Sequence, residues 1–359
     1  MIYYGVAAIF PLLMWLVNDT VGKTKKLKEK DKTRIKYGLV VAAILPMMLM
    51  FILRHMSVGA DTVGYVYFFE EEIRDISLSK IFSASDIRFE VGFQIYVKII
   101  SLLTDSYTVF FLINGLLIFG ILFHFAKKNT ENPFVFFFLF ITLGTYNFME
   151  TGLRQSLAMV ICLLAVDFLK KNKPSSVLVF VLLVVLAYFF HKSAIIFLLM
   201  CPLSLIKKFD WMFAIDAVLA LVLTFGFAFF QDMFNELLGY DYEIEETGNG
   251  GIFLALIIFI FAYSCLVMYN NRKKVDRQSL IVQLSLITII FWLLRLISRT
   301  AERISYYYIS GLYVYFAQAS HYDKSKDTVW IKWLLILACF ALFIYRNVGV
   351  TYHFFWQVV

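Results

Sequence analysis

Three arginines in the last third of the sequence have a spacing that could build an anion site. Arg295, Arg299 and Arg303 follow one another at intervals of four residues, so in a continuous helix they would share one face. Stacked positive charges repel one another, and an anionic partner would relieve this cost. The alternative is that they reach outward to water at a membrane interface, with Glu302 pairing one of them. We favour the anion site, because the planar guanidinium fits phosphate oxygens with two hydrogen bonds.

A second set of polar residues lies between pairs of adjacent apolar stretches. Arg154 could bind the same anion, or it could form an ion pair with Glu150 if the turn between them is helical. His191 and Lys192 share another such turn. Histidine can accept a proton because its ordinary pKa is about 6.5, although a lone histidine at such a place commonly has no role. Both residues are candidates for binding phosphate, and His191 is also a candidate base.

Two carboxylates complete the candidate chemistry. Residues 54–65 contain Arg54 and, between two glycines, Asp61. Flanking glycines indicate a tightly folded loop. A carboxylate in such a loop could act as a base or hold an arginine. Glu90 follows in the same long polar segment and is a third candidate base.

These residues must be positioned by membrane-spanning helices. The chain has 359 residues, of which 61% are hydrophobic and 16% charged, whereas soluble domains carry about 25% charged residues. Its apolar stretches lack strand-like alternation, which predicts an all-α polytopic bundle. We predict one integral membrane domain over residues 1–359 with about twelve transmembrane spans. The predicted spans are residues 2–17, 37–53, 107–126, 133–149, 156–169, 175–190, 194–206, 212–230, 252–269, 279–297, 304–319 and 333–345.

The distribution of Lys and Arg orients this bundle. The connector at residues 18–36 holds eight of them, and placing it in the cytoplasm puts the basic connectors inside and the acid-rich connectors outside. Both termini are then predicted outside. Eleven basic residues depart from this pattern, and eight of these are arginines, which suit anion recognition better than lysines do. They are Arg54, Arg74, Lys80, Arg88, Lys98, Arg154, Lys192, Arg295, Arg299, Arg303 and Arg346.

Two long segments are predicted at the outer face, residues 54–106 and 231–251. Within the first, residues 89–103 are mostly apolar but include Glu90 and Lys98, which favours an interfacial or re-entrant helix over a span. Seven candidate residues map to this face and to a similar depth, and we predict that they share one pocket. They are Arg54, Asp61, Glu90, Arg154, His191, Arg299 and Arg303.

Several function classes are excluded by what the sequence lacks. It contains no phosphate-binding glycine loop, zinc-protease, serine-hydrolase or dinucleotide-binding motif. Metal-ligand spacing is also absent, so we predict neither a cofactor nor a metal. The net charge of +7 resides mainly in short connectors, as membrane topology requires, so nucleic acid is not an expected partner.

Five short motifs occur in order along the chain. They are Arg54-x4-Gly59-x-Asp61-x3-Tyr65, Glu90-x-Gly92-Phe93, Arg154-Gln155, His191-Lys192-Ser193-Ala194 and Arg303-x2-Tyr306. Together they resemble the EpsG family, Wzy-type polymerases of bacterial exopolysaccharide and capsule repeat units, and the resemblance covers most of the chain. It implies a fold like the metal-independent branch of the GT-C membrane glycosyltransferases. It also implies a place in the bacterial cytoplasmic membrane, with an active site that faces outside.

The resemblance implies a glycosyltransferase whose donor and acceptor are oligosaccharides linked to undecaprenyl pyrophosphate. A flippase and a chain-length regulator of the same pathway would be further partners. Arginines can neutralise a leaving pyrophosphate without a metal, and a base must take the proton of the acceptor hydroxyl. The expected pyrophosphate residues are Arg54, Arg154, Arg299 and Arg303, assisted by Lys192 and Arg295, and the expected bases are His191 and Asp61, ahead of Glu90.

Three other functions fit part of the pattern. An O-antigen-type ligase would share the arginine pocket but would normally carry one dominant external domain. An acyltransferase that modifies the polysaccharide would need residues facing a cytoplasmic thioester donor, and the inner connectors offer mostly lysines. A transporter of lipid-linked oligosaccharides would place charges near the bilayer midplane and often shows repeated halves. Only Asp167 and Asp216 approach mid-span positions, and no repeat is visible.

Overall fold

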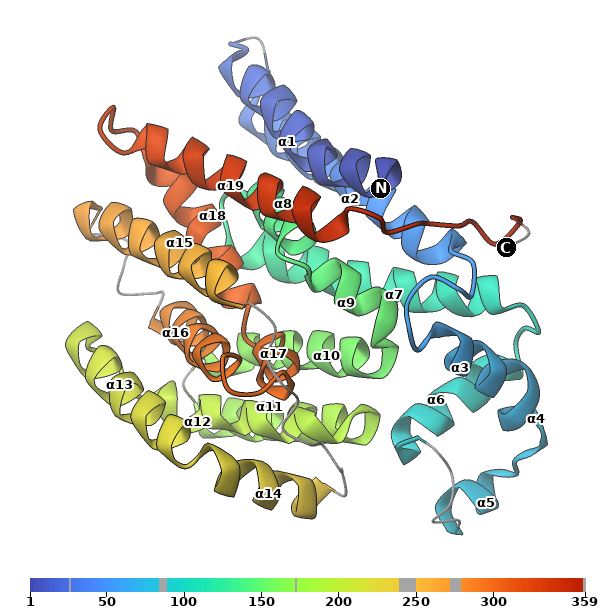
Figure 1. Ribbon diagram of the computed structural model, residues 1–359. Coiled ribbons are helices and arrows are strands. Elements are labelled where there is room, and N and C mark those ends of the chain that lie inside the picture. Colours follow the sequence, from blue (N-terminus) through green and yellow to red (C-terminus); the bar gives the residue numbers. More distant parts are fainter. Residues whose placement is uncertain (26, 84–88, 172, 239–249, 272–278, 358–359) are drawn as a thin grey trace.

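The structure is a computed structural model of the chain (Figure 1). It describes residues 1–359 except residues 26, 84–88, 172, 239–249, 272–278 and 358–359. Secondary structure in the described part is helical, apart from an isolated antiparallel bridge between Arg54 and Phe354. The all-α prediction is therefore confirmed. Arg88 and most of the predicted external segment 231–251 lie outside the described residues.

Long apolar helices identify the chain as a multi-pass membrane protein. Among the described residues, five helices are long and apolar enough to cross a membrane: α1 (Ile2–Lys23), α2 (Glu29–Leu53), α7 (Tyr107–Asn129), α15 (Gly251–Asn270) and α19 (Val329–Asn347). Two bent pairs would raise the number to seven. They are α8 (Pro133–Thr142) with α9 (Thr145–Thr151), bent by 59°, and α13 (Phe209–Phe225) with the first part of α14 (Phe227–Leu238), bent by 78°.

The prediction of about twelve spans is not supported, because the structure provides five to seven. The other five predicted spans are helical, but no described helix in them exceeds 17 residues, about 25 Å against a hydrocarbon core of about 30 Å. They are α10 (Leu153–Leu169), α11 (Pro174–Phe190), η2 (Lys192–Leu199) with α12 (Met200–Leu203), α16 (Ser279–Leu294), and α17 (Thr300–Ser305) with α18 (Ser310–Tyr322). Backbone breaks at Gly152, at His191 and after Leu294 limit these helices.

Two buried helices form the centre of the bundle. All ten residues of α8 are buried, and so is every residue of α18 from Ser310 to Ser320. α18 packs against α8, α15 and α16, while α1 packs on α2 and α8 (Figure 1). Because α8 is apolar around its whole circumference, it is stable only where other helices surround it. The helices around this centre carry the polar residues of the site at their ends.

Residues 62–83 and 91–101 form short helices at one end of the bundle (Figure 1). They are α3 (Thr62–Tyr67), η1 (Phe68–Glu72), α4 (Ile73–Asp75), α5 (Leu78–Ser83) and α6 (Val91–Ser101). α6 falls within the predicted interfacial or re-entrant helix at residues 89–103, and its place relative to a membrane stays a prediction. It packs closely on α11 because Gly92 has no Cβ, which would lie only 2.7 Å from the carbonyl oxygen of Phe189.

The segment at residues 350–355 runs along the same end. Tyr352 donates its hydroxyl hydrogen to the carbonyl oxygen of Met50 at 2.6 Å. Backbone hydrogen bonds of 2.8 and 2.9 Å join residues 53–55 to residues 353–355. The amino nitrogen of Met1 lies 3.0 Å from the carbonyl oxygen of Val350. The first residue of the chain therefore lies against the segment that follows α19. The outside location of both termini stays a prediction, and so does the division into a single domain.

Candidate functional site

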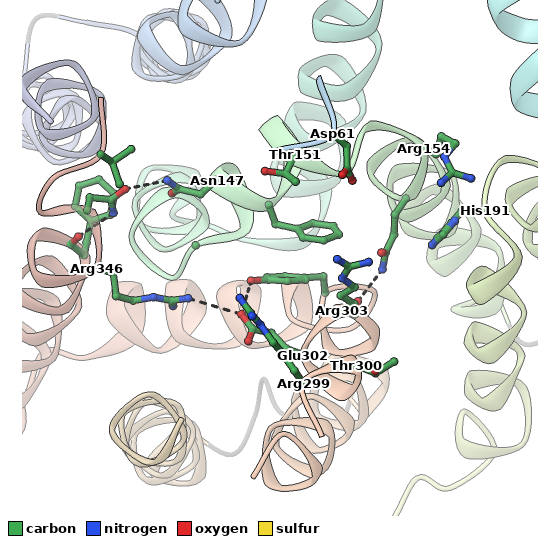
Figure 2. A pocket seen from close by; sticks show the side chains of 18 of the residues that line it. Asp61, Asn147, Thr151, Arg154, His191, Arg299, Thr300, Glu302, Arg303 and Arg346 are labelled. Atoms are coloured by element: carbon green, nitrogen blue, oxygen red, sulfur yellow. Dashed lines mark hydrogen bonds and ion pairs between the residues drawn. The ribbon is translucent and has the colours of Figure 1, made fainter. Parts of the chain in front are cut away.

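A cavity of about 700 Å³ lies where α9, α10, α17 and α19 meet (Figure 2). Its volume falls in the range typical of small-molecule sites, about 300–1,000 Å³. Five of the nine predicted site residues line it, although they come from positions far apart in the sequence. They are Asp61, Arg154, His191, Arg299 and Arg303. The structure thus brings these five together, while their chemical roles stay predictions.

Asp61 is held at the cavity by a loop that is fixed to α9. The loop turns from residue 55 to Asp61, where α3 begins, so the predicted tight loop ends at this residue. Gly59 has a φ of +90° and lies against the carbonyl oxygen of Glu150, where a Cβ would overlap that oxygen. Thr62 Oγ1 donates to the same oxygen at 3.0 Å. The Asp61 side chain remains exposed and lines the cavity.

Replacing Gly59 by Ala is expected to destabilise this loop and to lower activity. A residue with a Cβ costs about 1–2 kcal/mol in the left-handed region, and the overlap with the Glu150 oxygen adds to this cost. Thermal unfolding of the purified variant should show a lower midpoint. Gly38→Ala is the matched control, because a Cβ at Gly38 meets nothing within 4 Å. Equal midpoints for the two variants would contradict the proposed close contact.

Glu90, Arg154 and His191 form a cluster beside the cavity. The Glu90 carboxylate forms an ion pair with Arg154, and its other oxygen lies 3.2 Å from Nδ1 of His191. The backbone N–H of Lys192 donates to Glu90 at 3.4 Å. Arg154 therefore pairs with Glu90, and not with Glu150 as one of the two predictions had it. Glu90 does not itself line the cavity, so its position suits holding its two neighbours.

The protonation states in this cluster follow from its contacts, which lie outside the helices long enough to span a membrane. Burial raises the pKa of Glu90, but the hydrogen bond from His191 and the charge of Arg154 outweigh it, so this pKa falls to about 2. Burial lowers the pKa of His191 despite its contact with Glu90. Neutral His191 donates from Nδ1, because an ionised carboxylate can only accept. Nε2 is then the nitrogen able to take a proton.

The predicted arginine stripe is not a continuous helix. α16 ends at Leu294, and residues 295–299 form a turn before α17 begins. Arg299 and Arg303 nevertheless line the cavity, and both are exposed. Arg295 is buried away from it, and its Nε donates to Glu302 at 2.8 Å. Of the three arginines, Arg295 is therefore one that pairs with Glu302, as the alternative interpretation expected.

The backbone of Arg303 is fixed by α10. Gln155 Nε2 donates to the carbonyl oxygen of Arg303 at 2.7 Å, which joins α10 to α17 (Figure 2). Within the part of the chain that the structure describes, the Arg303 guanidinium makes no hydrogen bond or ion pair. Its donors are therefore available to a ligand in the cavity.

Arg54 lies inside the bundle and does not line the cavity. Its side chain is 0% exposed, and the guanidinium carbon lies 4.1 Å from the ring centres of both Phe51 and Phe111. Its charge is attracted by Glu150, to which Tyr4 donates a hydrogen bond of 2.7 Å. This placement departs from the expectation that Arg54 meets pyrophosphate or braces Asp61. A buried guanidinium between two rings stabilises packing of α2 against α7.

Further polar and aromatic residues of the cavity were not predicted as site residues. They are Asn147, Phe148, Glu302, Tyr306, Arg346 and Asn347. In the sequence, Arg346 stands out only as a basic residue at an unexpected end of a span. The sequence indicates Glu302 only as an ion-pair partner, and the remaining four residues are uncharged. Nothing in their spacing connects α9 with α19, because that contact is tertiary.

The described residues contain no group of three or more His, Cys, Asp or Glu side chains placed to hold a metal ion, and the metal-free site stays a prediction. The model of the EpsG family matches residues 37–357, most of the chain. No curated protein and no solved structure shows a significant match.

Proposed function

Because the chain belongs to the EpsG family of membrane proteins, which is linked to exopolysaccharide biosynthesis, we propose that it is a polysaccharide polymerase. Its substrates are oligosaccharide repeat units carried on undecaprenyl pyrophosphate at the outer face of the bacterial cytoplasmic membrane. The observation that carries the proposal is the single cavity that gathers Asp61, Arg154, His191, Arg299 and Arg303. This set offers both anion-binding groups and proton acceptors.

The leaving pyrophosphate is assigned to the arginines. Arg299 and Arg303 are exposed in the cavity, and Arg154 reaches it from α10 while it pairs with Glu90. Guanidinium groups that already lie in the cavity can donate hydrogen bonds to the negative charge that develops on the leaving oxygen. Arg303 contributes most in this proposal, because its donors are not used by the described protein groups.

The acceptor is activated by a base. The hydroxyl oxygen of the acceptor sugar forms a bond to the anomeric carbon of the donor, and the bond from that carbon to the pyrophosphate oxygen breaks. The electron pair of the broken bond remains on the pyrophosphate. The hydroxyl proton passes to Nε2 of His191, which Glu90 orients through Nδ1. Asp61 is the second candidate base, because its carboxylate lines the same cavity.

The direct test is a reconstituted reaction. Purified protein in liposomes is supplied with lipid-linked repeat units, and the products are separated by size. A ladder of longer lipid-linked chains is the expected result. Intact substrate that moves between leaflets without growing would indicate a transporter. A single transfer of preformed chains onto a different acceptor would indicate a ligase.

The rate should depend on pH through His191. Its pKa lies below the ordinary value of about 6.5, so the base is neutral at pH 7 and the rate should fall only at lower pH. Glu90→Gln removes a carboxylate that raises this pKa. The fall in rate on the acid side of the pH–rate profile, its acid limb, should therefore move to still lower pH. His191→Ala should lower the rate by about 10²–10⁴-fold.

The pH profile also separates the two candidate bases. If Asp61→Asn removes the reaction while His191→Ala keeps most of it, Asp61 is the base. An acid limb that stays at the same pH in Glu90→Gln would contradict the assignment of that limb to His191.

A further inference from the structure

The cavity continues beyond the proposed reaction centre into a second group of polar residues. Figure 2 shows Asp61, Arg154 and His191 on one side of it, and Asn147 and Arg346 on the other. Arg346 and Asn347 come from the last residues of α19, and Asn147 from α9. The chemistry proposed above uses none of these three. Because these three residues line the same cavity, we expect a separate part of the ligand to contact them.

Arg346 is held so that it offers donors next to a carboxylate. One of its guanidinium nitrogens, Nη2, lies 3.7 Å from Oε1 of Glu302. Glu302 also accepts hydrogen bonds from Arg295 at 2.8 Å and from the Tyr306 hydroxyl at 3.1 Å. Gly144 leaves room for the guanidinium, because a Cβ there would lie 3.4 Å from Nη1 of Arg346. The Glu302 carboxylate offsets part of the Arg346 charge, so a phosphate is attracted here less strongly than at Arg303.

The two asparagines are oriented by each other. Asn147 Nδ2 donates to Oδ1 of Asn347 at 2.9 Å (Figure 2). Asn347 Nδ2 in turn donates to the carbonyl oxygen of Phe343 at 2.8 Å. Both side chains line the cavity. A fixed amide offers a donor and an acceptor close together, which matches two neighbouring hydroxyl groups better than it matches an anion.

An aromatic surface lines the cavity with these groups. The rings of Phe148 and Tyr306 are stacked with their centres 4.3 Å apart. Gly152 makes room for Phe148, since a Cβ at that position would lie 3.0 Å from the Phe148 ring. Aromatic rings bind apolar surface at low entropic cost, and the C–H face of a sugar ring is such a surface.

From this arrangement we propose that Arg346, Asn147 and Asn347, with the Phe148 ring, form a sugar subsite. A pyranose hydroxyl can donate to Glu302 and accept from Arg346, so it can use both groups at once. The proposal rests on the polymerase function, and it names where a sugar of the repeat unit binds away from the breaking bond. That sugar belongs either to the donor or to the acceptor, and the experiment below distinguishes the two.

The test separates binding from turnover. The purified, reconstituted protein is given the lipid-linked repeat unit as donor and a short alkyl glycoside of the same repeat unit as acceptor, because the glycoside has no pyrophosphate to lose. Arg346→Gln and Asn147→Ala should raise the KM of one substrate by about 10-fold or more. The value of kcat should stay within about 3-fold of wild type. A higher KM for the glycoside assigns the subsite to the acceptor, and a higher KM for the lipid assigns it to the donor.

Two controls keep the test decisive. Arg74→Gln removes an arginine that pairs with Asp105 away from the cavity, and both KM values should stay unchanged. Saturation-transfer NMR measures sugar binding without turnover. The ligand is an oligosaccharide released from the polysaccharide that contains the repeat unit. Arg346→Gln should weaken that binding, and Arg303→Gln should retain it.

The outcomes have distinct meanings. Unchanged KM values and unchanged NMR binding in a folded Arg346→Gln protein would overturn the subsite while leaving the polymerase intact. If wild-type protein binds the sugar but makes no ladder, the polymerase function fails and the sugar subsite stands.

Discussion

Replacing Arg303 by Lys is expected to slow ladder growth by about 100-fold or more, because the loss of one donor to the developing charge costs about 10²–10³-fold in kcat. Lysine keeps the positive charge but loses the planar fork that contacts two phosphate oxygens. The carbonyl of Arg303 would still accept the hydrogen bond from Gln155, so the backbone of α17 should keep its position. The variant therefore tests the guanidinium group and not the fold. The measurement is the initial rate of chain extension with the lipid-linked repeat unit at saturation.

Lys25→Ala is the matched control for this result. Lys25 is an exposed residue of the connector between α1 and α2, and it does not line the cavity. Its replacement should leave the extension rate within a factor of about two. Equal rates for Arg303→Lys and Lys25→Ala would refute the assignment of pyrophosphate to Arg303.

The second large effect concerns stability and not turnover. Glu150→Leu is expected to lower the free energy of unfolding by about 1–3 kcal/mol, because it removes the carboxylate whose charge attracts the buried Arg54 guanidinium. Arg54 is 0% exposed and Glu150 is 3% exposed, so water cannot replace the lost carboxylate. The lost hydrogen bond from Tyr4 adds to the cost. The measurement is the thermal unfolding midpoint in detergent, together with the yield of folded protein.

The double variant provides the control within the same cluster. Arg54→Met with Glu150→Leu removes both charges, and buried pairs can be replaced by apolar side chains of similar volume at little cost. The double variant should therefore be more stable than Glu150→Leu alone. If the two changes simply add, as they do for independent sites, Arg54 and Glu150 do not form a coupled pair.

The sequence was sufficient to predict that several arginines share one site, but not the contacts within that site. Arg154, Arg299 and Arg303 depart from the expected distribution of basic residues between connectors, and this pattern predicts that they lie at the same end of the bundle. The structure brings them into one cavity. The partner of Arg154 could not be predicted. Glu150 is near it in sequence, whereas Glu90 reaches it only because α6 packs against α11.

Helix ends and burial were the least predictable properties. Leu296 and Ile297 continue an apolar stretch, so no residue signals that α16 ends at Leu294 and that Arg295 turns toward Glu302. The position of Arg54 at the end of α2 is compatible with facing a pocket. It is buried because Phe111 approaches it from α7, and that contact depends on how two helices pack.

The segment at residues 350–355 has a consequence for biosynthesis. Arg346, Asn347 and Val350 line the cavity, and Tyr352 contacts Met50, 302 positions earlier in the chain. A ribosome makes these residues about a minute after α2 at a slow elongation rate, on the order of 5 residues per second. The cavity wall is thus incomplete throughout most of membrane insertion. Nascent chains that stop before residue 346 would enter the membrane without a finished site.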